Sequence, residues 1–224
     1  IRRNIDPLGN YYVVRDPGRL IVEDRGGELD YDLVMPRIET IFGLVAVCPG
    51  VRLADMSLET IYEESYQHMK ELYGDEELTF KVNTRRANQN FTMPSMEVNA
   101  EVGSYLLERM PNLKVDVHKP DVVLNIEIRN SVYLHSKVVK TYGGLPYGSS
   151  GKGVSLLSGG IDSPVATWMM AKRGVEVEGV YFHSPPYTSE WAKEKVIDLA
   201  KRIADFTGEF RLYVVPFTEL QLYL

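Results

Sequence analysis

The sequence predicts a multidomain chain of the α+β and α/β classes that ends in a parallel β-sheet. Short strands and amphipathic helices fill the first 140 residues, and a glycine-rich connector follows at 143–151. Beyond the connector, apolar strands without polar alternation are separated by helices. Such strands are typical of a parallel sheet covered by helices on both faces.

Length and composition set the first limits on function. The 224 residues are enough for two or three domains, and 44% hydrophobic with 25% charged residues is typical of soluble globular proteins. No run of 18 apolar residues and no apolar signal sequence are found, so no membrane association is predicted. The single cysteine, Cys48, excludes an intrachain disulfide and is expected to be a buried structural thiol. We expect a cytoplasmic protein.

Charge is unevenly distributed along the chain. The net charge is −6, but residues 81–150 carry 9 basic and 6 acidic side chains, whereas residues 1–80 carry 8 and 16. Because salt screens distant charges, local charge matters more than the total. The middle third is therefore compatible with a polyanionic partner.

The first predicted domain, 1–50, is a small α+β unit. Strands at 11–15 and 19–24 are joined by the turn Asp16-Pro17-Gly18. A helix is predicted for 31–42 and a strand for 44–48.

The second predicted domain, 51–148, is of the α/β class, and its earliest start is residue 35. Ser57 is the expected N-cap of a helix to Tyr73, ended by Gly74. A second helix is predicted for 95–110, and strands for 79–84, 114–117, 122–129 and 132–139. The buried side of the second helix is expected to comprise Met96, Val98, Val102, Tyr105, Leu106 and Leu107.

The third predicted domain, 152–224, contains strands at 154–157, 177–182 and 210–215 and helices at 163–173 and 189–206. Because three strands make a small parallel sheet, we expect the first part of a larger domain.

The run from Leu156 to Pro164, LLSGGIDSP, lies where a buried strand turns into a helix. Ser163 is the expected N-cap and Pro164 suits the first helical turn. Two glycines let main-chain N–H groups approach a ligand, and the helix dipole favours an anion such as phosphate. Asp162 beside a phosphate indicates a bridging Mg²⁺.

An isolated Gly-Gly pair is common in turns, but the whole run between an apolar strand and a capped helix favours phosphate binding. The run matches neither the Rossmann pattern nor that of the P-loop NTPases. Gly151-Lys152 does not restore a P-loop, because Gly153 follows where Ser or Thr is needed.

This run resembles the signature of the PP-loop ATP pyrophosphatases, which split ATP into AMP and pyrophosphate. The resemblance implies that Asp162 is needed for adenylation and that the phosphates are held by Ser158, Gly159, Gly160, Asp162 and Ser163. It also implies main-chain contacts to the nucleotide from Leu156, Leu157, Tyr181 and Phe182, whose side chains are expected to lie in the sheet core.

Segments upstream resemble a THUMP domain, an RNA-binding module: KVNTRRAN from Lys81, VDVHKPD from Val115 and IEIR from Ile126. A ferredoxin-like domain, then THUMP, then PP-loop is the arrangement of the tRNA 4-thiouridine synthetase family. GGLP from Gly143 and HSPPYTS from His183 are also similar to that family.

The resemblance implies ATP-dependent adenylation of a tRNA uridine O4, followed by attack of a persulfide sulfur to give 4-thiouridine. It implies ATP and Mg²⁺ as cofactors, tRNA and a persulfide-donating cysteine desulfurase as partners, and a link to thiamine thiazole synthesis. The family's sulfur-carrying cysteine and a basic residue for adenylation belong to the later half of the PP-loop domain. That half has no counterpart before Leu224.

Basic residues are the candidates for RNA phosphate contacts, with ordinary solvated surface as the alternative: Lys81, Arg85, Arg86, Lys119, Arg129, Lys137 and Lys140. The four histidines lack metal-ligand spacing, so no direct protein metal site is predicted. Trp168 and Tyr181 are expected to be core residues and not stacking platforms.

Two other functions stay open: a non-catalytic RNA-binding protein with a degenerate ATP fold, and a PP-loop ligase acting on a small molecule. ATP binding that depends on Asp162 would exclude the first of these functions. Affinity for tRNA would exclude the second. The sequence does not decide tRNA specificity, homodimer formation or whether a rhodanese-like domain follows.

Overall fold

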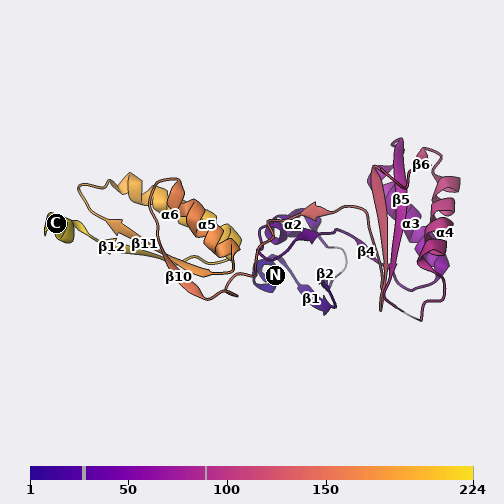
Figure 1. Ribbon diagram of the computed structural model, residues 1–224, viewed down its shortest axis with the longest axis horizontal. Helices are drawn as coiled ribbons and strands as arrows, with labels where there is room; N and C mark the ends of the chain where they lie inside the picture. The colour runs from indigo at the N-terminus through magenta and orange to yellow at the C-terminus, as the bar shows by residue number, and fades with distance from the viewer. Residues whose placement is uncertain (27–28, 89, 224) are drawn as a thin grey trace. The chain divides into compact units, whose positions relative to one another are not determined.

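The computed structural model describes residues 1–26, 29–88 and 90–223 (Figure 1). The chain forms two compact units: unit 1 comprises Ile1–Val47 and Val139–Leu224, and unit 2 comprises Cys48–Val138. No helix within the described ranges is long and apolar enough to cross a membrane.

The N-terminal part of unit 1 is a small α+β block around a core of Ile5, Tyr11, Val34 and Ile38. Its hairpin confirms the predicted strands, with Arg15 opposite Leu20. The elements are α1 (Arg2–Ile5), η1 (Asp6–Leu8), β1 (Tyr11–Asp16), β2 (Arg19–Asp24), α2 (Tyr31–Glu39) and β3 (Ala46–Val47).

The predicted helix over 31–42 is too long, because α2 ends at Glu39. Thr40 is its C-cap, and Gly43, with a left-handed φ of 93°, lies beyond the end of the helix. Cys48 follows β3 and is partly exposed, so the prediction of a buried thiol is wrong.

Unit 2 is a five-stranded mixed sheet in the order β4-β8-β7-β5-β6, with α3 and α4 side by side over one face (Figure 1). Ser57 caps α3 as predicted, since its side chain accepts from the Thr60 N–H. The elements are β4 (Val51–Arg52), α3 (Leu58–Tyr73), β5 (Leu78–Arg86), α4 (Ser95–Arg109), β6 (Leu113–Val115), β7 (Val122–Ile128) and β8 (Val132–His135).

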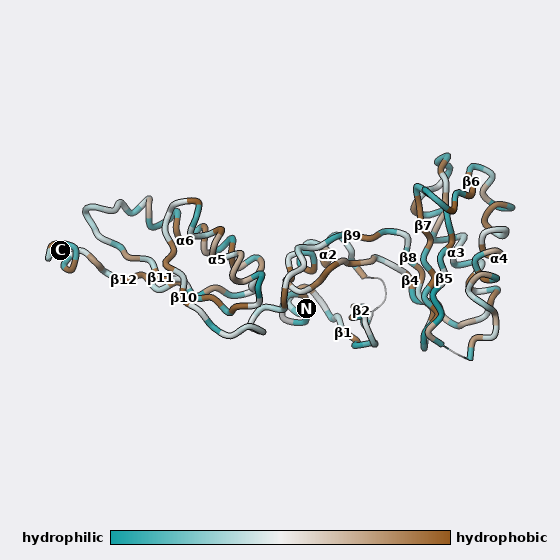
Figure 2. The backbone as a smooth tube through the Cα atoms, in the orientation of Figure 1, coloured by the Kyte–Doolittle hydropathy of each residue, from teal (hydrophilic) through white to brown (hydrophobic). Residues whose placement is uncertain are grey.

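Helix α4 buries Val98, Val102 and Leu106, a stripe with four-residue spacing that packs on the sheet. Figure 2 shows hydrophobic and hydrophilic residues alternating along this helix. Met96 and Leu107 were expected in the core but are 84% and 40% exposed, because they lie off this stripe. Tyr105 is only partly buried and stacks on Tyr62 of α3 instead.

The C-terminal part of unit 1 is a three-stranded parallel sheet in the order β10-β11-β12, as predicted. Ser189 caps α6 by accepting from the Ala192 N–H. The elements are β9 (Val139–Lys140), β10 (Lys152–Leu156), α5 (Asp162–Lys172), β11 (Glu176–His183), α6 (Glu190–Thr207), β12 (Leu212–Pro216) and α7 (Thr218–Tyr223).

Both α5 and α6 lie on the same face of this sheet, so the expectation of helices on both faces is wrong for the described chain (Figure 1). Right-handed crossovers between strands added in one direction place successive helices on one side. Val154 and Leu156 point away from the helices and are 68% and 65% exposed.

The glycine-rich connector is held in unit 1 by main-chain hydrogen bonds. The Gly43 N–H donates to the Gly143 carbonyl at 2.8 Å, and the Leu145 N–H donates to the Lys172 carbonyl at 2.9 Å. Val139, predicted as the last residue of the strand over 132–139, instead forms with Lys140 a separate strand that pairs with Ala46–Val47. The connector therefore ties the N-terminal block to the end of α5.

Phe42 stabilises the same region by packing in an aromatic cluster. It is 3% exposed and lies between Trp168 of α5 and Phe206 of α6, with ring centroids 5.3 and 5.6 Å away. Tyr142 completes the cluster from the connector side. Trp168 therefore packs against the core of unit 1, as the sequence predicts, although it is only partly buried.

Candidate functional site

The glycine-rich loop lies at the carboxyl end of β10 and leads into α5, where the sequence places the phosphate site. Two serines close it: the Ser158 N–H donates to Ser163 Oγ at 2.8 Å, and the two hydroxyl oxygens are 3.0 Å apart. Ser163 is therefore not the N-cap, because α5 begins at Asp162 and Ile161 occupies the cap position. The Ser163 hydroxyl holds the loop together instead of capping the helix.

The backbone of this loop does not itself require glycine. Nine glycines of the described chain have a left-handed φ, and neither Gly159 nor Gly160 is among them. A Cβ atom built on Gly159 would lie 3.7 Å from Lys195 Cδ, and one on Gly160 would lie 3.5 Å from Ser158 Oγ, both ordinary contacts. The chain would therefore accept alanine at either position, and the absence of a side chain leaves open space for a ligand.

The loop also carries main-chain donors without protein acceptors. Within the described chain, no protein acceptor is found for the N–H groups of Gly159 and Ile161, which precede the positive end of the α5 dipole. Ile161 is 82% exposed, so this part of the loop is open to solvent. Free N–H groups beside a helix N-terminus form an anion site suited to phosphate.

Two cations of α6 that the motif did not reveal, Lys195 and Arg202, line a cavity of about 360 Å³ that reaches Gly159 and Gly160. Most of the remaining lining consists of apolar side chains of α5 and α6. Lys195 is the cation with a direct approach to the loop, since its Cδ would lie 3.7 Å from a Cβ atom on Gly159. Four- and seven-residue spacing along α6 places Lys195, Leu199 and Arg202 on one face. Sequence position alone does not show that this face meets the loop.

Two other lysines of the same helix are engaged within the chain. Lys193 is held in an ion pair with Glu190, and Lys201 in an ion pair with Asp198. The structure therefore distinguishes the lysine beside the loop from its neighbours on α6.

The residues expected beneath the nucleotide divide into two pairs. Leu157 and Tyr181 are 2% and 7% exposed and lie in the core, as predicted. Leu156 and Phe182 are 65% and 42% exposed, so the prediction that their side chains are buried is wrong. They point to the face of the sheet that α5 and α6 leave open, because alternate residues of a strand face opposite sides.

A hydrogen-bonded histidine lies at the end of β11, at the same edge of the sheet as the glycine-rich loop. His183 is 8% exposed; its Nε2 lies 3.2 Å from Glu190 Oε1 and its Nδ1 lies 3.2 Å from Thr188 Oγ1. Thr188 Oγ1 also accepts from the Ser184 N–H at 2.8 Å. Hydrogen bonds from Lys193 and, to a smaller extent, from His183 keep the pKa of Glu190 below its usual range. This hydrogen-bond network holds the loop between β11 and α6 in place. The loop lies at the carboxyl ends of the strands, where ligands bind in open α/β sheets.

The donor set suits a magnesium ion shared with phosphate. Among the described residues, no group of three or more His, Cys, Asp or Glu side chains could hold a metal ion. Asp162 is exposed at the start of α5, beside the open N–H groups. A single carboxylate with substrate phosphate oxygens is a common way of holding Mg²⁺.

The candidate RNA-binding residues separate into groups. Arg85, Arg86 and Arg129 lie at the same end of the sheet, because the parallel strands β5 and β7 end side by side. As successive strand residues, Arg85 and Arg86 point to opposite faces of the sheet. Arg86 is held within the chain: its Nη1 donates to the Phe91 and Met93 carbonyls at 2.8 and 3.1 Å. Arg129 Nε lies 3.1 Å from the buried carboxylate of Glu127. Arg85 is exposed.

The other candidates are not part of this group. Lys81 Nζ donates to the Val117 carbonyl at 3.3 Å, and Lys119 precedes β7 at the opposite end of that strand. Lys137 follows β8, and Lys140 belongs to β9 in unit 1. The structure therefore places three of the seven candidates at one end of the sheet but does not bring all three side chains to one face.

A parallel sheet with this glycine-rich loop defines a nucleotide-binding protein of the PP-loop class, and unit 2 is a separate α/β module. Residues 148–224 match the family model described as thiamine biosynthesis protein (ThiI), and residues 56–135 match that of the THUMP domain. The chain is 48% identical over 98% of its length to a probable tRNA sulfurtransferase of Agathobacter rectalis. It is 50% identical over 99% of its length to one of Thermoanaerobacter pseudethanolicus.

Solved structures agree with these sequence matches. A 4-thiouridine synthetase in complex with RNA and bound ATP superposes with a TM-score of 0.87 and 39% identity, over 99% of this chain and 57% of that one. A protein of Pyrococcus horikoshii Ot3 gives a TM-score of 0.81 at 27% identity, over 99% of this chain and 74% of that one. The chain belongs to the tRNA sulfurtransferase (ThiI) family. It spans 55% and 57% of the length of the two curated relatives.

Proposed function

We propose that this chain is the RNA-binding and ATP-binding part of a tRNA sulfurtransferase that converts a uridine of tRNA to 4-thiouridine. One observation carries the proposal: an open PP-loop with an exposed Asp162 stands in the same chain as a THUMP module. The names of the relatives and the RNA and ATP of the neighbouring structure support it.

The proposed reaction has two steps. The uridine O4 attacks the α-phosphorus of ATP, the bond to the β-phosphate oxygen breaks, and pyrophosphate leaves. In the second step the outer sulfur of a persulfide attacks C4 of the uridine, and AMP leaves with the former O4. A thiol then attacks the inner sulfur of the S–S bond in this adduct, which releases 4-thiouridine and leaves a disulfide. The second step requires a sulfur donor, which the sequence analysis assigns to a partner desulfurase and which stays a prediction.

The residues of this chain contribute mainly to the first step. The N–H groups of Gly159 and Ile161 face the phosphates and stabilise charge that develops on the leaving pyrophosphate. Ser158 and Ser163 hold the loop in shape before the ligand binds. Asp162 would hold Mg²⁺, which neutralises phosphate charge when bound.

The test uses the full-length protein, as Asp162→Asn and, as the control, Asp205→Asn, which changes an exposed aspartate of α6. We expect Asp162→Asn to abolish ATP-dependent formation of 4-thiouridine in unmodified tRNA, measured by mass spectrometry, while the control keeps it. Full activity of Asp162→Asn, or no 4-thiouridine with the wild-type protein and a sulfide donor, would refute the proposal.

Binding of tRNA and consumption of ATP, measured on the same variants, address the alternatives. A non-catalytic RNA-binding protein would bind tRNA equally well with or without Asp162 and would not consume ATP. A ligase acting on a small molecule would consume ATP without affinity for tRNA. Dimer formation, a role in thiamine synthesis and the cytoplasmic location stay predictions.

A further inference from the structure

The first step of the proposed reaction releases a proton, and the glycine-rich loop offers no group to accept it. In uridine, N3 carries a proton and C4 is a carbonyl carbon. When O4 bonds to the α-phosphorus, the double bond moves to C4 and N3, so the N3 proton has to leave. Asp162 beside the loop is assigned to Mg²⁺. A second base at this edge of the sheet would accelerate the step.

Glu190 is a carboxylate at the same edge. The strands β10 and β11 run parallel, so the loops that follow them leave the sheet side by side. Glu190 is the first residue of α6, the helix that comes after the second of these loops. Lys195, whose Cδ approaches Gly159, is five residues further on, about 7.5 Å along the helix axis. The start of α6 therefore borders the nucleotide loop.

A buried imidazole holds the carboxylate in place. His183 is buried, and its Nε2 lies 3.2 Å from Glu190 Oε1, whereas the Glu190 side chain is 69% exposed. An ionised carboxylate only accepts hydrogen bonds, so Nε2 carries the proton. Nδ1 of the neutral ring then accepts from the Thr188 hydroxyl, whose oxygen accepts from the Ser184 N–H. Catalytic bases are commonly oriented by a second group in this way.

The Glu190 carboxylate is ionised and keeps free acceptor positions. Hydrogen bonds from Lys193 and, to a smaller extent, from His183 lower its pKa, so the base form is the one present at neutral pH. Lys193 Nζ donates to Oε2 at 3.1 Å, while Oε1 faces the imidazole. A carboxylate has about four lone-pair positions, so about two stay open to a ligand.

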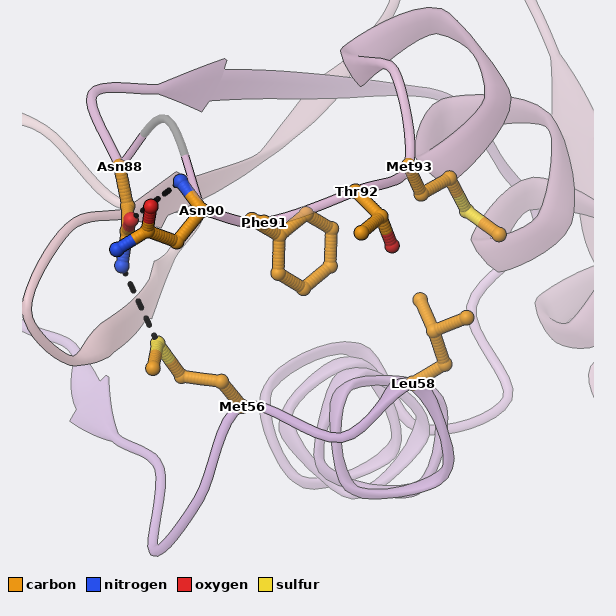
Figure 3. Close-up of a pocket in the computed structure, with 7 residues that line it drawn as sticks. All are labelled: Met56, Leu58, Asn88, Asn90, Phe91, Thr92 and Met93. Atoms are coloured by element: carbon orange, nitrogen blue, oxygen red, sulfur yellow. Dashed lines mark hydrogen bonds between the residues drawn. The ribbon is translucent and has the colours of Figure 1, made fainter.

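Two other hollows of the described chain offer no such base. A pocket of about 330 Å³ in unit 2, where β5 leads into α4, is lined by apolar side chains and by Asn88, Asn90 and Thr92 (Figure 3). None of its side chains titrates near neutral pH. The cavity between α5 and α6 is lined by two cations but by no carboxylate.

We propose that Glu190 takes the N3 proton of the target uridine as O4 attacks the α-phosphorus, with His183 as the residue that positions its carboxylate. The N–H electron pair becomes the π bond between N3 and C4, and the carbonyl π pair forms the bond from O4 to phosphorus. Pyrophosphate leaves with the electron pair of the broken P–O bond. When the thiol later releases the sulfur on C4, the proton returns from Glu190 to N3, which gives 4-thiouridine with a C4=S bond. The proposal rests on the proposed function.

The test compares Glu190→Gln and Glu190→Asp in the full-length protein. Glutamine keeps an oxygen that accepts from His183 but is not a base, and aspartate keeps a carboxylate on a shorter side chain. We expect Glu190→Gln to slow tRNA-dependent release of pyrophosphate by about 100-fold or more, the usual contribution of a general base, without weakening ATP or tRNA binding. Glu190→Asp should retain more of the rate. A purely structural role predicts the reverse order, because glutamine matches glutamate in size.

Glu194→Gln is the matched control, at an exposed carboxylate one turn along α6, and should keep the wild-type rate. A tRNA transcript with 5-fluorouridine gives an independent readout, because fluorine at C5 makes the N3 proton more acidic. We expect the ratio of the wild-type rate to the Glu190→Gln rate to be smaller on this RNA than on unmodified tRNA.

Three results would overturn the assignment of Glu190: an unchanged ratio on the fluorinated RNA, a wild-type rate for Glu190→Gln, or a rate for Glu190→Gln that equals or exceeds that of Glu190→Asp. If the wild-type protein formed no 4-thiouridine, the proposed function would fail instead. The two failures are therefore distinguished by the wild-type protein alone.

Discussion

The main-chain N–H of Ser158 donates to Ser163 Oγ at 2.8 Å, and this bond closes the nucleotide loop across five residues. Thr167 continues the support, since its hydroxyl donates to the Ser163 carbonyl at 2.7 Å and lies 2.6 Å from Ser155 Oγ. The loop is thus held by β10 and α5 before a nucleotide arrives. This arrangement separates residues that shape the loop from those that face the ligand.

Gly159→Ala should separate binding from folding. Because its backbone is not left-handed and its Cβ would meet only ordinary contacts, the free energy of unfolding should stay unchanged or rise by about 0.4–1 kcal/mol. The added methyl group should obstruct the phosphates, so ATP affinity should fall at least about tenfold by titration calorimetry, a loss of about 1.4 kcal/mol. Unchanged affinity would contradict the phosphate site.

Lys195→Met should weaken ATP binding, because the Lys195 side chain, which approaches Gly159 through its Cδ, carries a positive charge that attracts the phosphates. We expect a loss of about three- to tenfold at low salt, and a smaller one at about 0.5 M salt because of screening. Lys201→Met is the matched control, since Lys201 is paired with Asp198 on the same helix. Equal effects of the two substitutions would show that only the net charge matters.

Phe42→Ala should destabilise unit 1 by about 3–5 kcal/mol, the usual cost of removing a buried aromatic side chain. The ring is 3% exposed and stacks on Phe206 at an interplanar angle of 16°. Chemical denaturation measures the effect. Val45→Ala, at a side chain that is 80% exposed, should change stability by less than about 0.5 kcal/mol.

Gly144→Ala should cost more than Gly151→Ala, although both glycines have a φ of 85°. The left-handed conformation alone costs a non-glycine residue about 1–2 kcal/mol. At Gly144 the Cβ would also lie 2.3 Å from the Lys172 carbonyl oxygen, whereas nothing lies within 4 Å at Gly151. Equal melting temperatures of the two variants would show that the connector shifts to relieve the clash.

Unit 2 should lose stability as the pH falls through the range of histidine titration. Burial lowers the pKa of His68, whose Nε2 lies 2.9 Å from Ser136 Oγ. The unfolded chain therefore takes up this proton at higher pH than the folded chain does, and protonation favours unfolding. The stabilisation is present above the ordinary pKa of about 6.5 and is lost as the pH falls through the folded pKa.

Denaturation between about pH 7.5 and 5.5, on either side of the ordinary histidine pKa, checks this. His68→Gln should make the free energy of unfolding less dependent on pH, while His118→Gln, at an exposed histidine, should leave the dependence as it is. A wild-type profile that is flat over this interval would show that His68 does not control it.

Local patterns in the amino-acid sequence were sufficient to predict the order of the longer helices and strands, the Ser57 cap, the parallel sheet and the place of the glycine-rich loop, but not the short elements α1, η1, β4, β9 and α7. These features depend on strand and helix periodicity, capping side chains and glycines, all of which act over a few residues. The long-range contacts were visible only once the chain was folded: Lys195 beside Gly159, the Arg86 bond to the Phe91 carbonyl, and Phe42 packed between α5 and α6. Local periodicity does not encode which side chains meet across elements, so neither the exposed cations at the loop nor the aromatic junction could be predicted from the sequence.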